Sequence, residues 1–173
     1  MDLVRKYVRE ILIEGEVKFS GILKLMPSPE IVSQAQEILA TVPPSTDVDW
    51  GDGSGLNSHQ VIGLSPDKFH VTLAHQSVLK PFKKQLKALA KSGQLPTPPV
   101  VQLDPKWEER IDKNLKRVSY VAWVLNQSDL AAYLNSVMEL VGGPTNVWET
   151  ESPPRKFHVS LANLTGNPGD SVR

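Results

Sequence analysis

The chain of 173 residues contains no cysteine and no long hydrophobic run. Without cysteine it can form no disulfide, no thiolate nucleophile and no cysteine-ligated zinc site, and this composition fits a reducing compartment. No apolar segment approaches the roughly 18 residues that a membrane span requires. Residues 1–16 alternate charged and apolar side chains, unlike a secretory signal. We therefore expect a cytoplasmic protein that does not act at a membrane.

The chain also has no net charge, because 19 Lys and Arg balance 19 Asp and Glu. The distribution is uneven, however, since residues 80–118 hold ten basic and four acidic side chains. Such a segment could attract a polyanion such as an RNA strand. The interpretation favoured by the general behaviour of charge runs is a solvated face of a lysine-rich helix.

Hydrophobic spacing predicts a mixture of helices and strands. Helical periodicity covers residues 3–13, 29–40, 80–91 and 128–141. Short apolar or alternating runs predict strands at 17–26, 59–64, 68–74 and 117–125, whereas 106–116 fits either a strand or an irregular segment. Residues 41–58 form a long polar stretch, which we expect to be a loop that serves as a lid or pocket wall.

One phrase occurs twice. The octapeptide KFHVTLAH at 68–75 returns as KFHVSLAN at 156–163, and a strand, an amphipathic helix and a tryptophan-bearing loop precede each copy. This internal duplication predicts an α+β fold of two similar lobes related by a pseudo-twofold axis. The expected organisation is an N-terminal helical extension (1–16), a single bilobal domain (17–164) with repeats at about 17–92 and 98–164, and a flexible tail (165–173).

Alternate residues of a strand share a face, so each copy has a polar side and a hydrophobic side. The polar sides consist of Lys68, His70 and Thr72 in the first copy and Lys156, His158 and Ser160 in the second. Two imidazoles that face one groove can act as general base and general acid on a phosphodiester. The hydroxyls could bond the non-bridging phosphate oxygens, and the lysines could attract the anion.

A single His-x-Thr would more simply indicate a structural histidine, and the second copy at an equivalent place is what favours a site. A metal centre needs three or four ligands, and neither His59 nor His75 is repeated. We therefore expect no metal and no cofactor. His75 has the opposite strand parity to His70 and aligns with Asn163, so we expect it at the surface or at a strand end.

Aromatic residues supply further candidates for substrate binding. Trp50 and Trp148 lie in the loops before the two motifs, where they could stack on bases or, equally, anchor the loops on the core. Tyr120 and Trp123 lie on opposite faces of one strand, so at most one of them can face the groove. We take Tyr120 as the candidate contact.

The paired motifs H70-V-T72 and H158-V-S160, each in a hydrophobic strand, resemble those of the 2H phosphoesterase superfamily over residues 17–163. The superfamily includes RNA 2',3'-cyclic phosphodiesterases, 2'-5' ligases and phosphodiesterases, and phage nucleases that destroy the cyclic oligonucleotide signals of bacterial anti-phage immunity. The resemblance implies two antiparallel sheets around a central groove. It also implies acid and base roles for His70 and His158 and phosphate binding by Thr72 and Ser160.

We accordingly expect a monomeric, metal-independent phosphodiesterase. Its substrate would be an RNA 2',3'-cyclic phosphate, a 2'-5' linkage or a cyclic oligonucleotide, since all place a ribose 2'-oxygen near phosphorus. If a phage encodes the chain, the resemblance points to cyclic oligonucleotide immune signals and to the host cytoplasm. The alternative from another class is a module that binds a nucleotide or short RNA without cleaving it.

Overall fold

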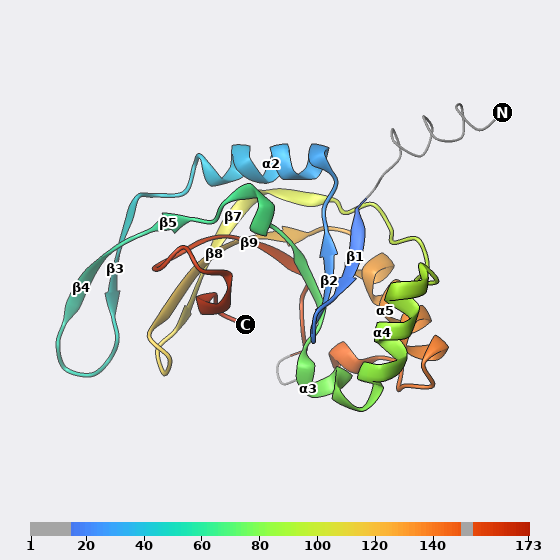
Figure 1. Ribbon diagram of the computed structural model, residues 1–173. Coiled ribbons are helices and arrows are strands. Elements are labelled where there is room, and N and C mark those ends of the chain that lie inside the picture. The colour runs from blue at the N-terminus through green and yellow to red at the C-terminus, as the bar shows by residue number, and fades with distance from the viewer. Residues whose placement is uncertain (1–14, 150–153) are drawn as a thin grey trace.

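The computed structural model describes residues 15–149 and 154–173 and shows an α+β fold with antiparallel strands (Figure 1). The helix expected at 3–13 lies outside the described residues. The strands are β1 (Glu16–Phe19), β2 (Leu23–Met26), β3 (Ser45–Asp49), β4 (Leu56–Gln60), β5 (Ile62–Gly63), β6 (Val71–Ala74), β7 (Leu103–Asp112), β8 (Arg117–Val124) and β9 (His158–Asn163). The helices are α2 (Pro29–Leu39), α3 (Gln76–Leu79), α4 (Lys83–Ser92) and α5 (Gln127–Leu140). Short 3-10 turns are η1 (Pro66–Lys68), η2 (Lys80–Phe82), η3 (Val147–Glu149) and η4 (Pro168–Asp170).

Seven strands form one sheet of order β1-β2-β6-β9-β8-β7, with β5 added beside β9, and β3 and β4 form a separate hairpin. First-repeat strands β1, β2 and β6 fill one half, and second-repeat strands β7, β8 and β9 fill the other, so the order is the same from either edge. The halves meet where β6 and β9 pair at one position, Val71 opposite Val159. The two strand sets expected as separate sheets are therefore joined at the motif strands.

A β-bulge occurs at the same place in both motif strands. In β6, Thr72 lies opposite Lys24 and Ala74 opposite Leu23, which leaves Leu73 as the extra residue. In β9, Ser160 lies opposite Val121 and Ala162 opposite Tyr120, which leaves Leu161 as the extra residue. A bulge increases the local twist and bends its strand, so the two motif strands share the same irregularity.

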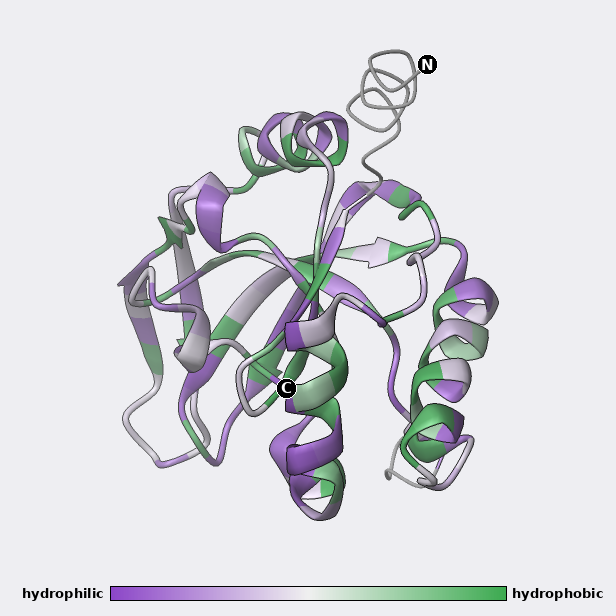
Figure 2. Cartoon of the chain, turned by 45° about the vertical axis from the view of Figure 1, so that its right-hand side comes forward, coloured by the Kyte–Doolittle hydropathy of each residue, from purple (hydrophilic) through white to green (hydrophobic). Residues whose placement is uncertain are grey.

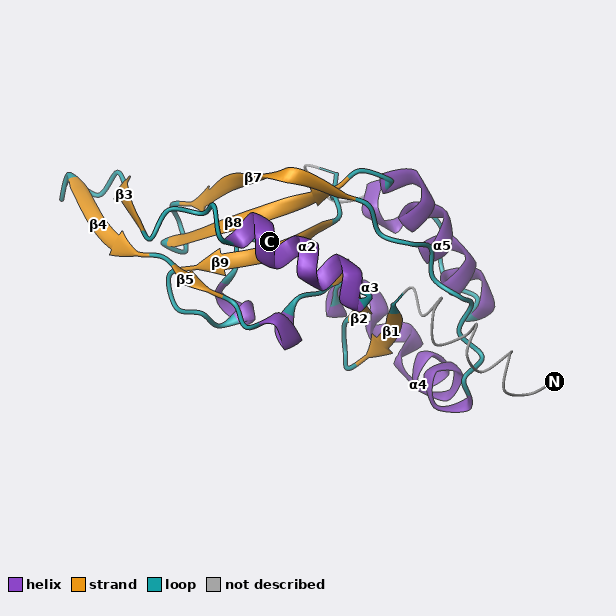
Figure 3. Cartoon of the chain, turned by 90° about the horizontal axis from the view of Figure 1, so that it is seen from above, coloured by secondary structure: helices purple, strands orange, loops and turns teal. Residues whose placement is uncertain are grey.

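Two helices pack against strands of the other repeat. Helix α2 of the first repeat packs against β7 and β9, and α5 of the second packs against β6. Seen from above, α2 crosses the sheet, with α4 and α5 at one end and the β3–β4 hairpin at the other (Figure 3). Hydrophobic and hydrophilic residues are mixed along each helix, as amphipathic packing on a sheet requires (Figure 2). Among the described residues, no helix is both long enough and apolar enough to cross a membrane.

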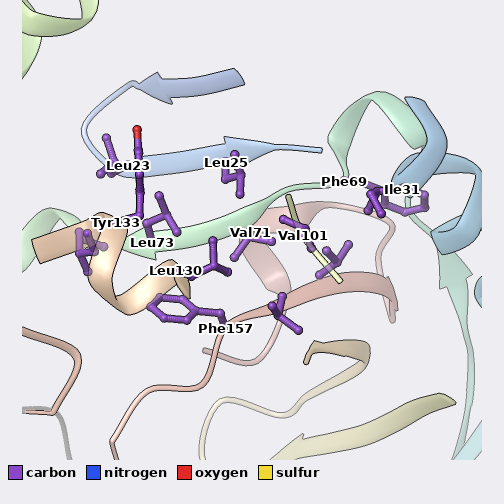
Figure 4. Packing of buried hydrophobic residues seen from close by; sticks show 14 of the residues in the cluster. Leu23, Leu25, Ile31, Phe69, Val71, Leu73, Val101, Leu130, Tyr133 and Phe157 are labelled. Atoms are coloured by element: carbon purple, nitrogen blue, oxygen red, sulfur yellow. The ribbon is translucent and has the colours of Figure 1, made fainter. Parts of the chain in front are cut away.

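The main core lies under the hydrophobic side of the motif strands. Leu130 and Tyr133 of α5 lie beside Leu73 of β6, and Phe69 lies against Ile31 of α2 (Figure 4). The motif residues buried in this core are Phe69, Val71, Leu73, Phe157, Val159 and Leu161. All six expose at most 1% of their surface, so this part of the repeated phrase makes the core.

Several local predictions need correction. The stretch 17–26 is a hairpin of two strands, β1 and β2, because Gly21 adopts the left-handed φ of 95° that a tight turn requires. The expected loop at 41–58 is largely the β3–β4 hairpin. It packs Val48 and Trp50 on Val118 and Tyr120, and it is tied to the β7–β8 turn by a 2.8 Å ion pair between Asp52 and Lys116.

The C-terminal segment, expected as a flexible tail at 165–173, is packed on the sheet. Asn163 is fully buried, and its side chain accepts from the N–H groups of Thr165 (3.0 Å) and Gly166 (2.7 Å). The buried Val172 donates its N–H to the hydroxyl of Ser119 at 2.6 Å. The polar composition hid this docking, because it is made by hydrogen bonds to two buried strand residues rather than by hydrophobic spacing.

Candidate active site

The pairing of Val71 with Val159 determines which motif residues share a face. Because alternate residues share a face, the neighbours of these two valines, His70 and Thr72 in one motif and His158 and Ser160 in the other, point to the other side of the sheet. The paired valines lie on the same face, so these four residues share the one turned away from the buried valines. We call His70, Thr72, His158 and Ser160 the polar quartet. All four are half-buried.

Both imidazoles are held in the same way by the backbone. Nδ1 of His70 lies 2.8 Å from the carbonyl oxygen of Lys68, and Nδ1 of His158 lies 3.1 Å from that of Lys156. A carbonyl can only accept, so each Nδ1 carries the hydrogen. In the neutral imidazole Nε2 then has the free lone pair, and in the imidazolium it has the transferable proton. The two rings therefore present the same nitrogen for chemistry.

The electrostatic environment favours the neutral form of both histidines. Burial lowers the pKa of His158 to about 4, and the positive charges of Arg110, Arg155 and protonated His70 act in the same direction. Burial also lowers the pKa of His70, assisted by Lys24. Because the charge of His70 acts on His158, the two rings are electrostatically coupled and disfavour double protonation.

This pKa shift predicts a pH dependence of stability. The folded-state pKa of His158, about 4, lies below the unfolded value of roughly 6.5, so the unfolded chain binds the proton more tightly. Its contribution is therefore complete above about pH 6.5 and is lost as the pH falls toward 4, by at most about 3 kcal/mol. Urea unfolding at several pH values should show a flatter profile for His158→Asn than for the wild type. Parallel profiles would contradict the assignment.

Trp123 is the aromatic residue of this face. It lies opposite His158 in the β8–β9 register, and the two rings meet edge to face with centroids 5.4 Å apart. The indole nitrogen donates to Glu108 at 2.7 Å. The ring also contacts the cations of Arg110 (5.6 Å) and Lys156 (5.7 Å). The Trp123 ring therefore packs against His158 and contacts two cationic groups beside it.

Cations surround the polar quartet from several elements. Lys24 of β2 lies opposite Thr72. Arg110 of β7 is half-buried and donates to the backbone oxygens of Val172 (3.4 Å) and Arg173 (2.8 Å). Burial lowers the pKa of Arg110, so its charge is incompletely solvated. A partly desolvated cation beside two coupled imidazoles favours an anionic ligand.

The lysines of the motif contribute mainly through their backbone. Lys68 belongs to the 3-10 turn η1 rather than to β6, so strand parity does not determine its direction. Both Lys68 and Lys156 have exposed side chains, and their carbonyl groups orient the two histidines. The lysines of α4, which give the 80–118 segment most of its charge, are exposed on that helix.

Two predicted substrate contacts lie away from the polar quartet. Trp50 is 8% exposed and packs in the small core under the hairpin, where its nitrogen donates to His59 at 3.2 Å. Tyr120 is 1% exposed, on the face opposite Trp123, and donates its hydroxyl to Glu109. Trp50 therefore anchors the hairpin, and the assignment of Tyr120 to the groove is corrected in favour of Trp123.

Of the remaining aromatic candidates, Trp148 lies in η3, partly packed on the main core and lining a pocket beside α5. His75 is at the strand end, as the N-cap of α3. Sequence reasoning did not select Trp123, Arg110, Arg155 or Lys24. Alternation along the strand showed that only one of Tyr120 and Trp123 can face the groove. The β8–β9 register is needed to decide which of the two it is.

The different positions of Trp123 and Tyr120 predict different effects of their substitution. For the phosphodiesterase activity expected from the sequence, Trp123→Leu should lower kcat/KM about tenfold, because His158 and two cations lose their shared contact. Tyr120→Phe should leave kcat/KM near wild type and lower only stability, since its hydroxyl bonds Glu109 on the other face. Steady-state kinetics and thermal melts of both variants separate the two roles, and equal kinetic losses would reject the assignment.

No group of three or more His, Asp or Glu side chains that could hold a metal ion occurs in residues 15–149 and 154–173. No family model, curated protein or solved structure matches this chain. The chemistry of the site must therefore be argued from its own residues, which offer two histidine nitrogens, two hydroxyls and nearby cations.

Proposed function

We propose that the chain is a metal-independent phosphodiesterase of the 2H type, acting on a nucleotide-derived phosphodiester. The proposal is supported chiefly by the pairing of Val71 with Val159, because alternation along the two strands then turns both His-x-Thr/Ser motifs to the same face of the sheet. The face between the two halves of the sheet would be the substrate groove. The cations around it suit a phosphate.

The reaction uses both imidazoles in different protonation states. In hydrolysis of a ribose 2',3'-cyclic phosphate, a water oxygen bonds to phosphorus and gives its proton to Nε2 of the neutral histidine. The bond from phosphorus to one ribose oxygen breaks, and that oxygen takes the proton from Nε2 of the imidazolium. Thr72 and Ser160 donate hydrogen bonds to the non-bridging oxygens, where negative charge increases in the transition state.

Charge supports His158 as the base. Its pKa of about 4 keeps it neutral near pH 7, and Arg110 and Arg155 oppose its protonation. The acid role then falls to His70, whose pKa burial lowers in the ligand-free protein. A bound phosphodiester places a negative charge beside this ring and raises its pKa, because an opposite charge stabilises the imidazolium. Substrate binding thus supplies the proton donor.

The test is a panel of purified substrates in EDTA. Ribonucleoside 2',3'-cyclic phosphates, 2'-5' and 3'-5' linked oligoribonucleotides and cyclic di- and trinucleotides are incubated with the protein, and the products are resolved by mass spectrometry. Cleavage of at least one class in EDTA is expected. Activity that EDTA abolishes and a divalent metal restores would contradict the two-histidine mechanism, and binding without any product would favour the non-catalytic nucleotide-binding alternative.

A further inference from the structure

A pocket of about 540 Å³ lies between the first half of α5 and residues 148–149 and 155–157. This volume falls in the range of roughly 300–1,000 Å³ typical of small-molecule sites. It does not include the polar quartet, so it is a separate space. Its lining combines an indole ring, alanine and phenylalanine surface, amide groups, one carboxylate and two cations. The residues that matter here are Ala131, Trp148, Glu149, Arg155, Lys156 and Phe157.

The aromatic and cationic parts of the pocket are fixed to each other. Trp148 packs partly on the main core, and its carbonyl oxygen accepts from the N–H of Arg155 at 3.0 Å. The next part of the wall is anchored by Gln127 of α5. Its amide donates to the carbonyl of Phe157 and accepts from the N–H of Phe157, each at 2.7 Å. The backbone that carries the ring and the two cations is therefore held in place.

The pocket adjoins the candidate active site through Arg155 and Lys156. Lys156 lines the pocket, while its carbonyl accepts from His158 at 3.1 Å and its ammonium group lies 5.7 Å from the centre of the Trp123 ring. Arg155 lines the pocket too, and its charge contributes to the lowered pKa of His158. A ligand whose phosphate meets the histidines can thus continue past these two cations into the pocket.

We infer that this pocket takes the nucleotide next to the scissile phosphate, which makes the substrate an oligonucleotide of at least two residues. The inference rests on the proposed phosphodiesterase function. The base of that nucleotide stacks on Trp148, since an indole accepts any base by its π-face. Its phosphate lies against Arg155 and Lys156, which guanidinium and ammonium groups suit. A mononucleotide 2',3'-cyclic phosphate would leave the pocket empty.

The test compares adenosine 2',3'-cyclic phosphate with the adenosine dinucleotide that ends in the same cyclic phosphate. The wild type should show a kcat/KM about 5- to 100-fold higher for the dinucleotide, the range that stacking of one base on an aromatic ring gives. Trp148→Leu, which keeps an apolar side chain against the core, should bring this ratio close to one. Trp148→Phe should restore most of it. Arg155→Gln should lower the ratio, whereas Arg117→Gln, a matched change at a different pocket, should not.

The outcomes separate the pocket from the chemistry. A wild-type ratio near one, or a ratio that Trp148→Leu leaves unchanged while thermal melts show a folded protein, overturns the pocket assignment but leaves the phosphodiesterase proposal standing. If neither compound is turned over, the substrate panel still decides the phosphodiesterase proposal, and the pocket assignment is tested by binding instead. A 5'-phosphorylated deoxyadenosine dinucleotide should then bind more tightly than deoxyadenosine monophosphate by the same factor in equilibrium dialysis. Equal affinities, or a difference that survives in Trp148→Leu, overturn the inference.

Discussion

Replacing either His70 or His158 with alanine should lower kcat by about 100- to 10,000-fold, the range that one positioned acid or base contributes. The two losses should be similar, because the reaction needs both protons to move and each ring is oriented by an equivalent carbonyl contact. The double variant should be little slower than either single one, since residues that act as one unit are strongly non-additive. Single-turnover kinetics on the best substrate of the panel measures all three.

His59→Ala is the matched control for this prediction. His59 bonds Trp50 in the hairpin that packs on Val118 and Tyr120, so it lies on the face opposite the polar quartet. Its loss should leave kcat near wild type at temperatures where circular dichroism shows a folded protein. If His70→Ala or His158→Ala retained more than a tenth of wild-type kcat, the ring would not be a catalytic acid or base.

The sequence predicted the burial pattern of the repeated motif better than it predicted the pairing of the strands around it. The alternation of side chains along a strand correctly predicted that Phe69, Val71 and Leu73 are buried. It also predicted that His70 and Thr72, on the other face, are partly exposed. Parity is a local property with period two, so one strand suffices to read it. The α+β class followed from the local patterns, the antiparallel strands were implied by the family resemblance, and both are confirmed.

Features that depend on pairing between distant segments could not be predicted from the local sequence. The choice of Trp123 over Tyr120 needs the β8–β9 register, and a bulge at Leu161 changes that register by one residue. The packing of residues 165–173 on the sheet depends on Ser119 and Asn163. These are polar side chains, so no hydrophobic pattern predicts that they are buried. Both copies of the repeat carry Leu-Ala at the position of the bulge. The sequence alone does not show that a bulge occurs there, because the bulge is defined by the pairing with the neighbouring strand.

The second large effect concerns stability. Phe69→Ala and Phe157→Ala should each lower the free energy of unfolding by about 3–5 kcal/mol, because both rings are fully enclosed and no neighbour can fill the space completely. Since a domain is typically stable by only about 5–15 kcal/mol, either change should shift the urea midpoint strongly. The losses should resemble each other, because the two rings occupy equivalent places just before β6 and β9, one residue before each histidine.

Phe19→Ala provides the comparison within the same residue type. Phe19 lies on the edge strand β1, is half-buried and packs only against the margin of the main core. Truncation there should cost less than half as much, since less apolar surface is lost and solvent can fill the space. Urea unfolding with a common m-value would rank the three variants. A small loss at Phe157 with a large one at Phe69 would mean that the second repeat does not support its histidine as the first does, and the pseudo-twofold reading of the site would then fail even with both imidazoles in place.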